Sequence, residues 1–396
     1  MSTLQRKGLG DVTTRGRTVL VRVDFNVPLE GARVTDDARL TAALPTIRRL
    51  MGDGCRVVLC SHLGRPGGRR VPSMSLRPVA AALREHLGQD VAFAPDPVGP
   101  RARRTVDALR PGQVALLENT RFYPEEERND EVFARALAGL GDFFVQDAFG
   151  AVHRAHASTV GVTRHLPSVA GLLLEREVGA LSRLLDGERP FVAIIGGAKV
   201  SDKLRVLEHL LPRVDRLLIG GGMANTFLSA LGYGTGRSLV EPDLVPAAEH
   251  LIAEAGRRGV ELLLPVDLVV GNFFLRQADY RIVQVDQVPP EWMAMDIGPL
   301  TVERFAGALR GAATIFWNGP LGVAEWPNFA AGTAGVARAL AGCSEAFTVV
   351  GGGDVVAALR RLDLSGGVRH ISTGGGASLE FLEGRELPGI AALEAR

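Results

Sequence analysis

The chain has 396 residues, with 45 basic and 44 acidic side chains, and its formal net charge is +1. This balance and an aromatic content of 6% argue against a nucleic-acid-binding protein, which usually carries a strong basic excess. Three Cys without zinc-ligand spacing (Cys55, Cys60 and Cys343) fit a reducing compartment, and neither a secretory signal nor a membrane-spanning stretch is recognisable. We therefore expect a cytoplasmic protein of two or three domains, with no nucleic-acid or membrane partner.

Short apolar, β-branched segments recur along the chain and alternate with segments of helical period. Strands are predicted at 18–25, 55–60, 142–149, 191–197, 216–222, 261–270, 314–320 and 347–353. Helices are predicted between them, for example at 37–54 and 201–214. Nearly continuous apolar strands that alternate with helices indicate parallel α/β sheets buried on both faces. Many strands end in Gly, Asn or Asp, which places polar loops at the carboxyl edge, where open α/β sheets bind ligands.

Charge divides the chain into two halves. Residues 1–170 hold 24 bases and 18 acids (+6), whereas residues 171–396 hold 21 bases and 26 acids (−5). This split is either drift of surface charge or a preference of the first half for a small anion. An amphipathic segment at 166–190 predicts a long helix between the two groups of strands, so we place a domain boundary near residue 170.

In the first half, polar side chains follow the predicted strands inside turns of small residues. A guanidinium group has the planar fork that suits phosphate or carboxylate. Each Arg alone is more often a solvated surface charge, but their placement favours a shared anion site. His153 and His156 lack an acidic or Cys partner for a metal site. The candidates are Asp24 and Asn26 in RVDFNVP, Arg39 at a helix start, His62 and Arg65 in SHLGRP, Arg121 in LLENTRF and Arg154 in DAFGAVHRAHAS.

In the second half, five apolar strands run into Gly-rich loops, at 194–203, 218–228, 316–325, 349–355 and 370–384. One Gly pair is more often a tight turn, but five such loops favour close approach of backbone to a ligand. In the first loop, Ser201 is predicted to cap a helix and to place Lys199 and Lys203 on one face of it. Neither a Walker A sequence nor GxGxxG occurs, which argues against P-loop NTPases and dinucleotide dehydrogenases.

Two acidic side chains in these loops have both a purely structural and a functional interpretation. Asp354 follows three Gly and is suited either to capping a helix or to holding Mg²⁺ through one carboxylate. Glu325 is either a surface charge or a hydrogen-bond partner for a ribose. Lys is rare in this chain, since only Lys7, Lys199 and Lys203 stand against 42 Arg. Two of the three occur in GGAKVSDK, which marks Lys199 and Lys203 as functional positions.

Taken together, these motifs resemble the phosphoglycerate kinase family, in order and over essentially the whole chain. The resemblance implies an α/β fold of two doubly wound, Rossmann-like parallel-sheet domains joined by a connecting helix and a hinge. It implies a phosphoglycerate-binding domain at 1–170, a nucleotide-binding domain at 171–375 with its connector helix at about 168–186, and a segment at 376–396 that returns to the first domain. It also implies a hinge-bending monomer.

The resemblance further implies reversible transfer of the acyl phosphoryl group of 1,3-bisphosphoglycerate to Mg-ADP, giving 3-phosphoglycerate and ATP, in glycolysis or gluconeogenesis, with Mg²⁺ as cofactor. Lys199, Arg39 and the amides of Gly375 and Gly376 would stabilise the charge of the moving phosphoryl group. For the site that binds phosphoglycerate, the resemblance implies Asp24, Asn26, Arg39, His62, Arg65, Arg121 and Arg154. On the nucleotide side it implies Gly197, Ala198, Lys199, Lys203, Gly221, Phe274, Met295, Asn318, Pro320, Gly322, Glu325, Gly353, Asp354 (also the metal ligand) and Val355.

Two alternatives stay open at this point. One is a non-catalytic or moonlighting relative that keeps the fold, against which the complete set of charged residues argues. The other is a kinase of the same fold that acts on a different acyl phosphate. The chain departs from the family pattern at Val355, where Thr or Ser is usual, and this leaves its nucleotide preference open.

Overall fold

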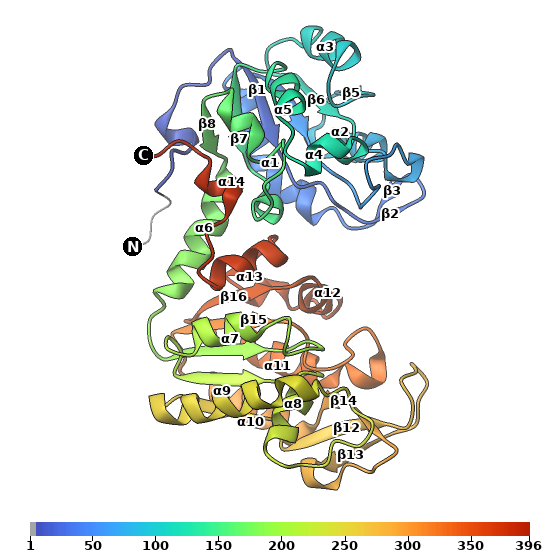
Figure 1. The fold of residues 1–396 in the computed structure, drawn as a ribbon, viewed down its shortest axis with the longest axis vertical. Helices are drawn as coiled ribbons and strands as arrows, with labels where there is room; N and C mark the ends of the chain where they lie inside the picture. Colours follow the sequence, from blue (N-terminus) through green and yellow to red (C-terminus); the bar gives the residue numbers. More distant parts are fainter. Residues whose placement is uncertain (1–4) are drawn as a thin grey trace. The chain divides into compact units, whose positions relative to one another are not determined.

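The computed structural model describes residues 5–396, which form two compact units. The N-terminal unit holds residues 5–179 and 385–396, and the C-terminal unit holds residues 180–384. The division falls within helix α6 (Leu172–Leu185), and Figure 1 shows the red C-terminal segment beside the N-terminal unit. The expected boundaries at 170 and 376 thus precede the positions where the units change, after Gly179 and after Gly384.

The N-terminal unit is built on a six-stranded parallel sheet with the strand order β5-β6-β4-β1-β7-β8. A separate antiparallel pair, β2 and β3, extends the loop that follows β1. The strands are β1 (Thr18–Arg22), β2 (Leu29–Glu30), β3 (Arg33–Val34), β4 (Arg56–Cys60), β5 (Val91–Ala94), β6 (Val114–Leu117), β7 (Phe143–Gln146) and β8 (Ser168–Ala170).

Both faces of this sheet are covered, as the continuous apolar strands predict. Val19 and Val21 belong to one hydrophobic core, and Leu20 points to the other face, yet all three are fully buried. The helices of the unit are α1 (Ala38–Gly52), α2 (Arg77–Leu87), α3 (Pro100–Asp107), α4 (Pro124–Glu127), α5 (Glu131–Ala138), the start of α6 and α14 (Pro388–Ala391). The helix expected at 37–54 is confirmed as α1.

The connecting helix is shorter than the expected segment 166–190. Residues 168–170 form strand β8, and α6 begins only at Leu172. Its first turn is capped by the buried Asp147, whose Oδ1 accepts hydrogen bonds from the amides of Leu173 (2.9 Å) and Leu174 (3.3 Å). Burial raises the pKa of Asp147 to about 7 despite these bonds. A tertiary contact therefore sets the start of this helix.

The C-terminal unit has a second six-stranded parallel sheet, in the order β11-β10-β9-β15-β16-β17, and a three-stranded antiparallel sheet, in the order β13-β12-β14. The parallel strands are β9 (Phe191–Ile195), β10 (Arg216–Ile219), β11 (Glu261–Leu263), β15 (Thr314–Asn318), β16 (Phe347–Gly351) and β17 (His370–Ile371). The antiparallel strands are β12 (Asp267–Gly271), β13 (Tyr280–Gln284) and β14 (Met293–Ile297).

The single strand expected at 261–270 is wrong, because the segment divides between the two sheets. Leu263 ends β11 and Asp267 begins β12, with Pro265 between them. Proline has no backbone N–H for a sheet ladder, so the chain leaves the parallel sheet there and turns into the antiparallel one.

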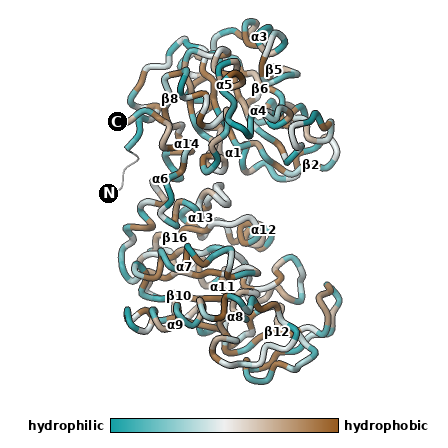
Figure 2. The backbone as a smooth tube through the Cα atoms, viewed as in Figure 1, coloured by the Kyte–Doolittle hydropathy of each residue, from teal (hydrophilic) through white to brown (hydrophobic). Residues whose placement is uncertain are grey.

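Helices complete the C-terminal unit around a core that contains the fully buried Trp317. Figure 2 shows hydrophobic strands between largely hydrophilic connections. No helix within residues 5–396 is long and apolar enough to cross a membrane. The helices are the end of α6, α7 (Leu204–Leu210), α8 (Ala224–Ala230), α9 (Val245–Arg258), α10 (Pro299–Leu309), α11 (Ala331–Ala341), α12 (Gly353–Arg361) and α13 (Gly376–Leu382).

Candidate active site

In the N-terminal unit, the predicted site residues follow strands that end at the same edge of the sheet. Asp24 lies two residues after β1, and His62 lies two residues after β4. Arg121 lies in a 3₁₀ helix (Thr120–Phe122) after β6, and Arg154 lies in the connection after β7. Because β1, β4, β6 and β7 are parallel, their carboxyl ends meet, and four separate loops contribute to one place.

Arg39, in the first turn of α1, is fixed by the loop after β1. Its Nη1 donates to Asp24 Oδ1 (3.1 Å) and to the carbonyl oxygen of Asn26 (3.1 Å). The side chain of Asn26 instead accepts a hydrogen bond from the amide of Gly64, at 2.8 Å. β1 ends at Arg22, so Asp24 and Asn26 both lie in the loop that holds Arg39 and the 61–66 turn.

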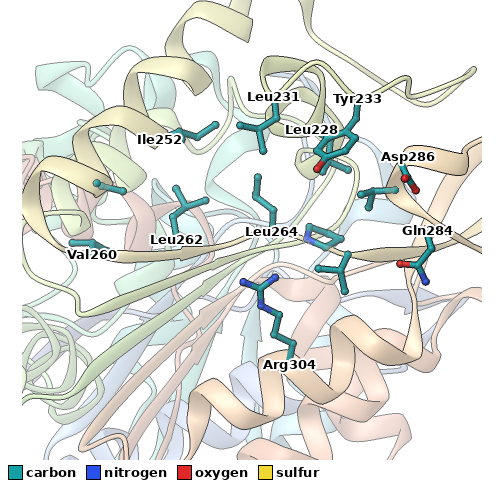
Figure 3. Close-up of a pocket in the computed structure, with 15 residues that line it drawn as sticks. Leu228, Leu231, Tyr233, Ile252, Val260, Leu262, Leu264, Gln284, Asp286 and Arg304 are labelled. Atoms are coloured by element: carbon teal, nitrogen blue, oxygen red, sulfur yellow. The ribbon is translucent and has the colours of Figure 1, made fainter.

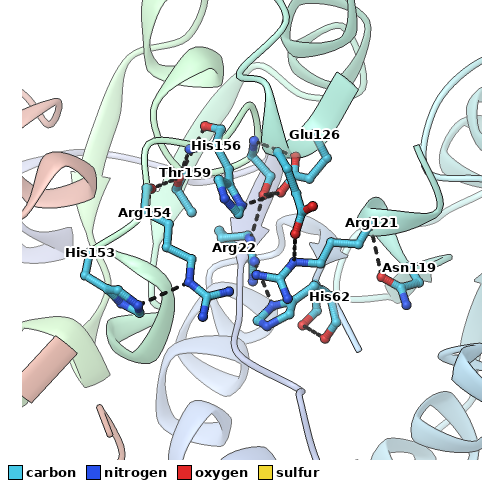
Figure 4. Close-up of polar contacts among 12 residues, drawn as sticks. Arg22, His62, Asn119, Arg121, Glu126, His153, Arg154, His156 and Thr159 are labelled. Carbon is cyan, nitrogen blue, oxygen red and sulfur yellow. Dashed lines mark hydrogen bonds and ion pairs between the residues drawn. The ribbon is translucent and has the colours of Figure 1, made fainter. Parts of the chain in front are cut away.

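His62 is buried and neutral at the centre of the cluster. Burial, together with the positive charges of Arg22, Arg121, Arg154 and Arg39, holds the pKa of its imidazole well below the usual value. Arg22 Nη2 lies 3.1 Å from His62 Nδ1. A guanidinium can only donate, so Nδ1 is the acceptor and the ring proton is on Nε2. Figure 4 shows His62 beside Arg22 and Arg121.

Arg121 and Arg154 bring further positive charge to the same place. The guanidinium of Arg121 is 3% exposed, and its Nη1 donates to the carbonyl oxygen of Gly64 at 2.9 Å. Its Nε lies 3.2 Å from the Glu127 carboxylate, but it makes no hydrogen bond within residues 5–396. Burial and the charge of Arg154 lower the pKa of Arg121 to about 10. Arg154 Nε donates to His153 Nε2 at 3.1 Å.

The charges of this cluster do not balance. Arg39 pairs with Asp24, Arg121 lies beside Glu127, and Arg22 is linked through Ser158 to Glu126. Arg154 forms no ion pair with any carboxylate of the described chain, so its charge is left over. A surplus guanidinium and an unbonded buried Nε are what a site for a small anion requires.

Arg65 is the one predicted residue of this group that the structure does not join to the others. Its side chain is exposed and makes no hydrogen bond or ion pair inside the described range. Asn119, which was not among the predicted residues, fixes the turn that carries Arg65. Asn119 Nδ2 donates to the carbonyl oxygen of Leu63 (2.7 Å), and its Oδ1 accepts from the amide of Arg121 (3.1 Å). Asn119 lies in the same LLENTRF motif, two residues before Arg121, and this position in the sequence could have identified it.

We expect two imidazoles of this cluster to titrate far below an ordinary His. Burial and the neighbouring Arg154 lower the pKa of His153 to about 4, and burial with Arg121 lowers that of His156 to about 3. The unfolded chain takes up these protons near pH 6.5. The two groups therefore stabilise the fold above pH ~6.5, and this contribution is lost as the pH falls through about 4 for His153 and about 3 for His156. NMR titration, assigned with His153→Asn and His156→Asn, measures both values; midpoints near 6.5 would contradict the geometry.

In the C-terminal unit, the five Gly-rich loops lie at one sheet edge. They follow β9, β10, β15, β16 and β17, which are parallel. Three of the loops pack backbone against backbone, where a side chain does not fit. A Cβ at Gly196 would lie 2.2 Å from the carbonyl oxygen of Pro320. A Cβ at Gly221, whose φ is +70°, would lie 2.6 Å from the carbonyl oxygen of Gly197. These contacts place Gly197, Gly221 and Pro320 side by side.

Lys203, in the loop after β9, links the loop after β15 and, through it, the loop after β16. Its Nζ donates to Asn318 Oδ1, and Asn318 Nδ2 in turn donates to the carbonyl oxygen of Gly351 at 2.9 Å. Burial lowers the pKa of Lys203, while the charges of Asp202, Asp354 and Glu383 act in the opposite direction. Asp354 is exposed in the first turn of α12 and makes no hydrogen bond or ion pair among residues 5–396. It does not cap the helix, because Gly352 occupies the N-cap.

The predicted cap at Ser201 is wrong, and so is the helical face shared by Lys199 and Lys203. Helix α7 begins only at Leu204. The Glu241 carboxylate holds the preceding turn instead, accepting from the amides of Val200 (2.6 Å) and Ser201 (3.1 Å). It also accepts from Ser201 Oγ at 2.6 Å. This distant carboxylate left no signal in the motif. Lys199 is exposed beside the turn and forms no hydrogen bond within the described residues.

Met295 lies in β14 and Phe274 in the connection between β12 and β13, and both contact residues 319–326. The carbonyl oxygen of Met295 accepts from the amide of Val323 at 2.8 Å, one residue after Gly322. The ring of Phe274, 60% exposed, packs on Trp326 with a centroid distance of 4.8 Å. Trp326 was not predicted, although it directly follows Glu325, which is exposed.

The last members of the predicted set are backbone positions. Gly375 is the N-cap of α13 with φ +53°, and a Cβ there would meet no atom within 4 Å. Gly376 is exposed, Ala198 is exposed in the turn before Lys199, and Gly353 is exposed at the start of α12. Val355, by contrast, is fully buried in the core of the unit. Its side chain therefore serves packing in the core of the C-terminal unit.

A pocket of about 590 Å³ opens elsewhere in the C-terminal unit, between α8, α9, the β11–β12 connection and α10. Figure 3 shows Leu264 and Arg304 beside it. None of the predicted site residues lines it. For metals, no group of three or more His, Cys, Asp and Glu in the described part of the chain is arranged to hold an ion.

Comparison with known proteins gives a consistent result. The phosphoglycerate kinase family model matches residues 9–385. The chain belongs to the phosphoglycerate kinase family. It is 57% identical to the phosphoglycerate kinase of Moorella thermoacetica over 386 residues, which cover 97% of this chain and 98% of that protein. It is 55% identical to the phosphoglycerate kinase of Pelotomaculum thermopropionicum, covering 98% and 99%.

Solved structures of phosphoglycerate kinases share the fold. That of Coxiella burnetii superposes with a TM-score of 0.87 at 41% identity, over 98% of each chain. That of Pyrococcus horikoshii superposes with a TM-score of 0.85 at 36% identity, over 97% of this chain and 98% of its own. The expected fold of two parallel α/β domains is thereby confirmed, and the chain is a kinase of this family.

Proposed function

We propose that this kinase transfers the acyl phosphoryl group of 1,3-bisphosphoglycerate to Mg-ADP, reversibly, giving 3-phosphoglycerate and ATP. The observation that carries the proposal is the unbalanced guanidinium cluster at the carboxyl edge of the N-terminal sheet. It offers Arg39, Arg121 and Arg154 to a small, multiply charged anion. The names of the two relatives reported above, which are 57% and 55% identical across nearly the whole chain, support the same substrate pair.

The reaction needs no general base. In the forward direction, the bond between the acyl oxygen and phosphorus breaks, a bond from an ADP phosphate oxygen to phosphorus forms, and a carboxylate leaves. Both nucleophiles, the ADP oxygen and the carboxylate in reverse, are already ionised at neutral pH. The neutral state of His62, His153 and His156 fits this chemistry. Catalysis then consists of positioning and of charge stabilisation, for which we assign Lys199, Arg39 and the amides of Gly375 and Gly376.

On the nucleotide side we assign the Gly-rich edge of the C-terminal sheet. The backbone of Gly197 is open to close approach, since a Cβ there would meet only Lys203 at 3.9 Å, whereas Gly221 packs behind it against the Gly197 backbone. Lys203 and Asn318 support the same edge. Asp354 fits Mg²⁺, because an exposed single carboxylate with no partner in the described structure is the usual protein ligand of a nucleotide metal. When bound, the ion supplies charge neutralisation to the phosphates. Phe274 and Trp326 offer an apolar surface for the base.

A coupled assay with 3-phosphoglycerate and Mg-ATP tests the proposal directly. Turnover by the folded protein is the expected result, with removal of Mg²⁺ by a chelator abolishing it. Folded protein without turnover would instead favour the non-catalytic relative. Turnover on another carboxylate but not on 3-phosphoglycerate would favour the kinase of a different acyl phosphate.

Arg154→Met is expected to raise the KM for 3-phosphoglycerate. A hydrogen bond to a charged group contributes about 1.5–3 kcal/mol, which corresponds to about 10- to 150-fold in affinity. The KM for Mg-ATP should not move. Arg164→Met is the matched control, because Arg164 is exposed and its ion pair is with Glu131, away from the cluster. Equal values of KM for 3-phosphoglycerate in the two variants would exclude Arg154 from the anion site.

A further inference from the structure

Arg22 is a buried cation that lies beside the predicted anion site. Its side chain is 1% exposed, at the carboxyl end of β1. Nε donates to Ser158 Oγ at 2.8 Å, and Nη2 donates to His62 Nδ1 at 3.1 Å. A buried guanidinium needs a nearby negative charge, and none lies in direct contact with it in the described chain.

Glu126 supplies this negative charge, and the hydroxyl group of Ser158 links its carboxylate to Arg22. Glu126 is fully buried in α4. Its Oε2 accepts from the amide of Ser158 (3.0 Å), and its Oε1 accepts from Ser158 Oγ (2.5 Å). Since the hydroxyl proton goes to Glu126, a lone pair of Ser158 Oγ faces Arg22. Figure 4 shows this chain of contacts from Glu126 toward Arg22 and His62.

The chain of contacts ends on a residue of the site. Because Arg22 occupies His62 Nδ1, the imidazole presents Nε2–H as its only remaining donor. The same contact fixes the orientation of the ring, as the other nitrogen of a His is usually set by such a partner. The loop that carries Ser158 also carries Arg154, and Thr159 Oγ1 holds it by donating to the carbonyl oxygen of Arg154 at 2.6 Å.

We propose that Glu126 and Ser158 are positioning residues for the acid substrate: they hold Arg22 so that it fixes the tautomer and orientation of His62. This inference rests on the proposed function. Neither residue is part of the set predicted from sequence, and neither is exposed to contact substrate. Their effect is therefore confined to the geometry of the anion site, and nucleotide binding by the C-terminal unit should not change.

Ser158→Ala is the decisive variant, because it removes the bridging hydroxyl and keeps both charges. We expect the KM for 3-phosphoglycerate to rise about three- to tenfold, the range for loss of one hydrogen bond, with the KM for Mg-ATP unchanged. Ser168→Ala is the control, because Ser168 is as deeply buried as Ser158. Its hydroxyl donates to the carbonyl oxygen of Leu166 and not to a charged group. Glu126→Gln should act in the same direction as Ser158→Ala. Glu125→Gln should not, because Glu125 lies in the same helix but is only half-buried and pairs with Arg128 at 3.0 Å.

A ¹⁵N NMR measurement of His62 separates positioning from general loss of structure. In the wild type, the shifts should report an Nε2–H tautomer with Nδ1 as acceptor. In Ser158→Ala the two tautomers should mix, whereas Ser168→Ala should keep the wild-type state. An unchanged His62 tautomer together with an unchanged KM in Ser158→Ala would overturn the inference. Absence of turnover in the wild type would refute the proposed function instead, and the NMR comparison would still decide the role of Ser158.

Discussion

Lys199→Ala is expected to lower kcat by about 10²–10³, the usual cost of removing one preorganised donor to the charge of a transition state. The side chain is exposed and makes no hydrogen bond in the described structure, so its loss should leave the fold intact. A compact ammonium on a flexible stem can follow the moving phosphoryl group, which the planar fork of Arg does less well. Steady-state kinetics and the melting temperature of the variant check both statements, with affinity for Mg-ATP retained.

Lys7→Ala provides the control for this variant. Lys7 is another of the three Lys of the chain, but it lies in the N-terminal unit and pairs with Glu394 at 2.9 Å. It should keep the wild-type kcat. A kcat for Lys199→Ala within a factor of two of the wild type would remove Lys199 from the charge-stabilising set, and the rarity of Lys in this chain would then carry no functional meaning.

Gly196→Ala is expected to destabilise the C-terminal unit and to disable nucleotide binding together. The added methyl group would lie 2.2 Å from the carbonyl oxygen of Pro320 and 2.8 Å from that of Gly319. These are backbone atoms, so relief requires separation of the loops after β9 and β15. Overpacking of this kind typically costs about 1–3 kcal/mol and occasionally more. Chemical denaturation gives the free energy of unfolding, and titration with Mg-ADP gives the affinity.

Gly256→Ala is the matched control in the same unit. A Cβ at Gly256, near the end of α9, meets no atom within 4 Å. Replacing a helical Gly by Ala commonly adds about 0.5–1 kcal/mol of stability. Opposite signs for the two substitutions are therefore expected. If Gly196→Ala bound Mg-ADP like the wild type, the backbone packing between the two loops would not define the nucleotide side.

The local hydrophobic pattern was sufficient to predict a strand or helix wherever the structure of a segment depended on its own residues. The apolar strands at 18–25, 55–60 and 191–197 follow from continuous β-branched residues, because a strand buried on both faces tolerates few polar ones. Their polar ends locate the two loop clusters, since parallel strands bring their carboxyl ends together. Motif resemblance then supplied the residue set in order, from Asp24 to Gly376.

Local pattern failed where a distant group fixed a boundary. Ser201 has the residue type of a helix cap, yet Glu241 takes the amides of Val200 and Ser201 and delays the start of α7 to Leu204. Asp147 likewise decides where α6 begins. These contacts join residues far apart in sequence, and the periodicity of a single segment cannot predict them.

The sequence by itself determined the fold class, the family and the edges of the two sheets at which the polar residues gather. The tertiary structure decided the protonation states and the charge balance: that His62 is neutral with its proton on Nε2, that Arg154 has no carboxylate partner among residues 5–396, and that Val355 faces the core. The physical reason is that strand and loop placement follow from local hydrophobic pattern, whereas a pKa or an ion pair depends on burial and on charges contributed by several separate loops.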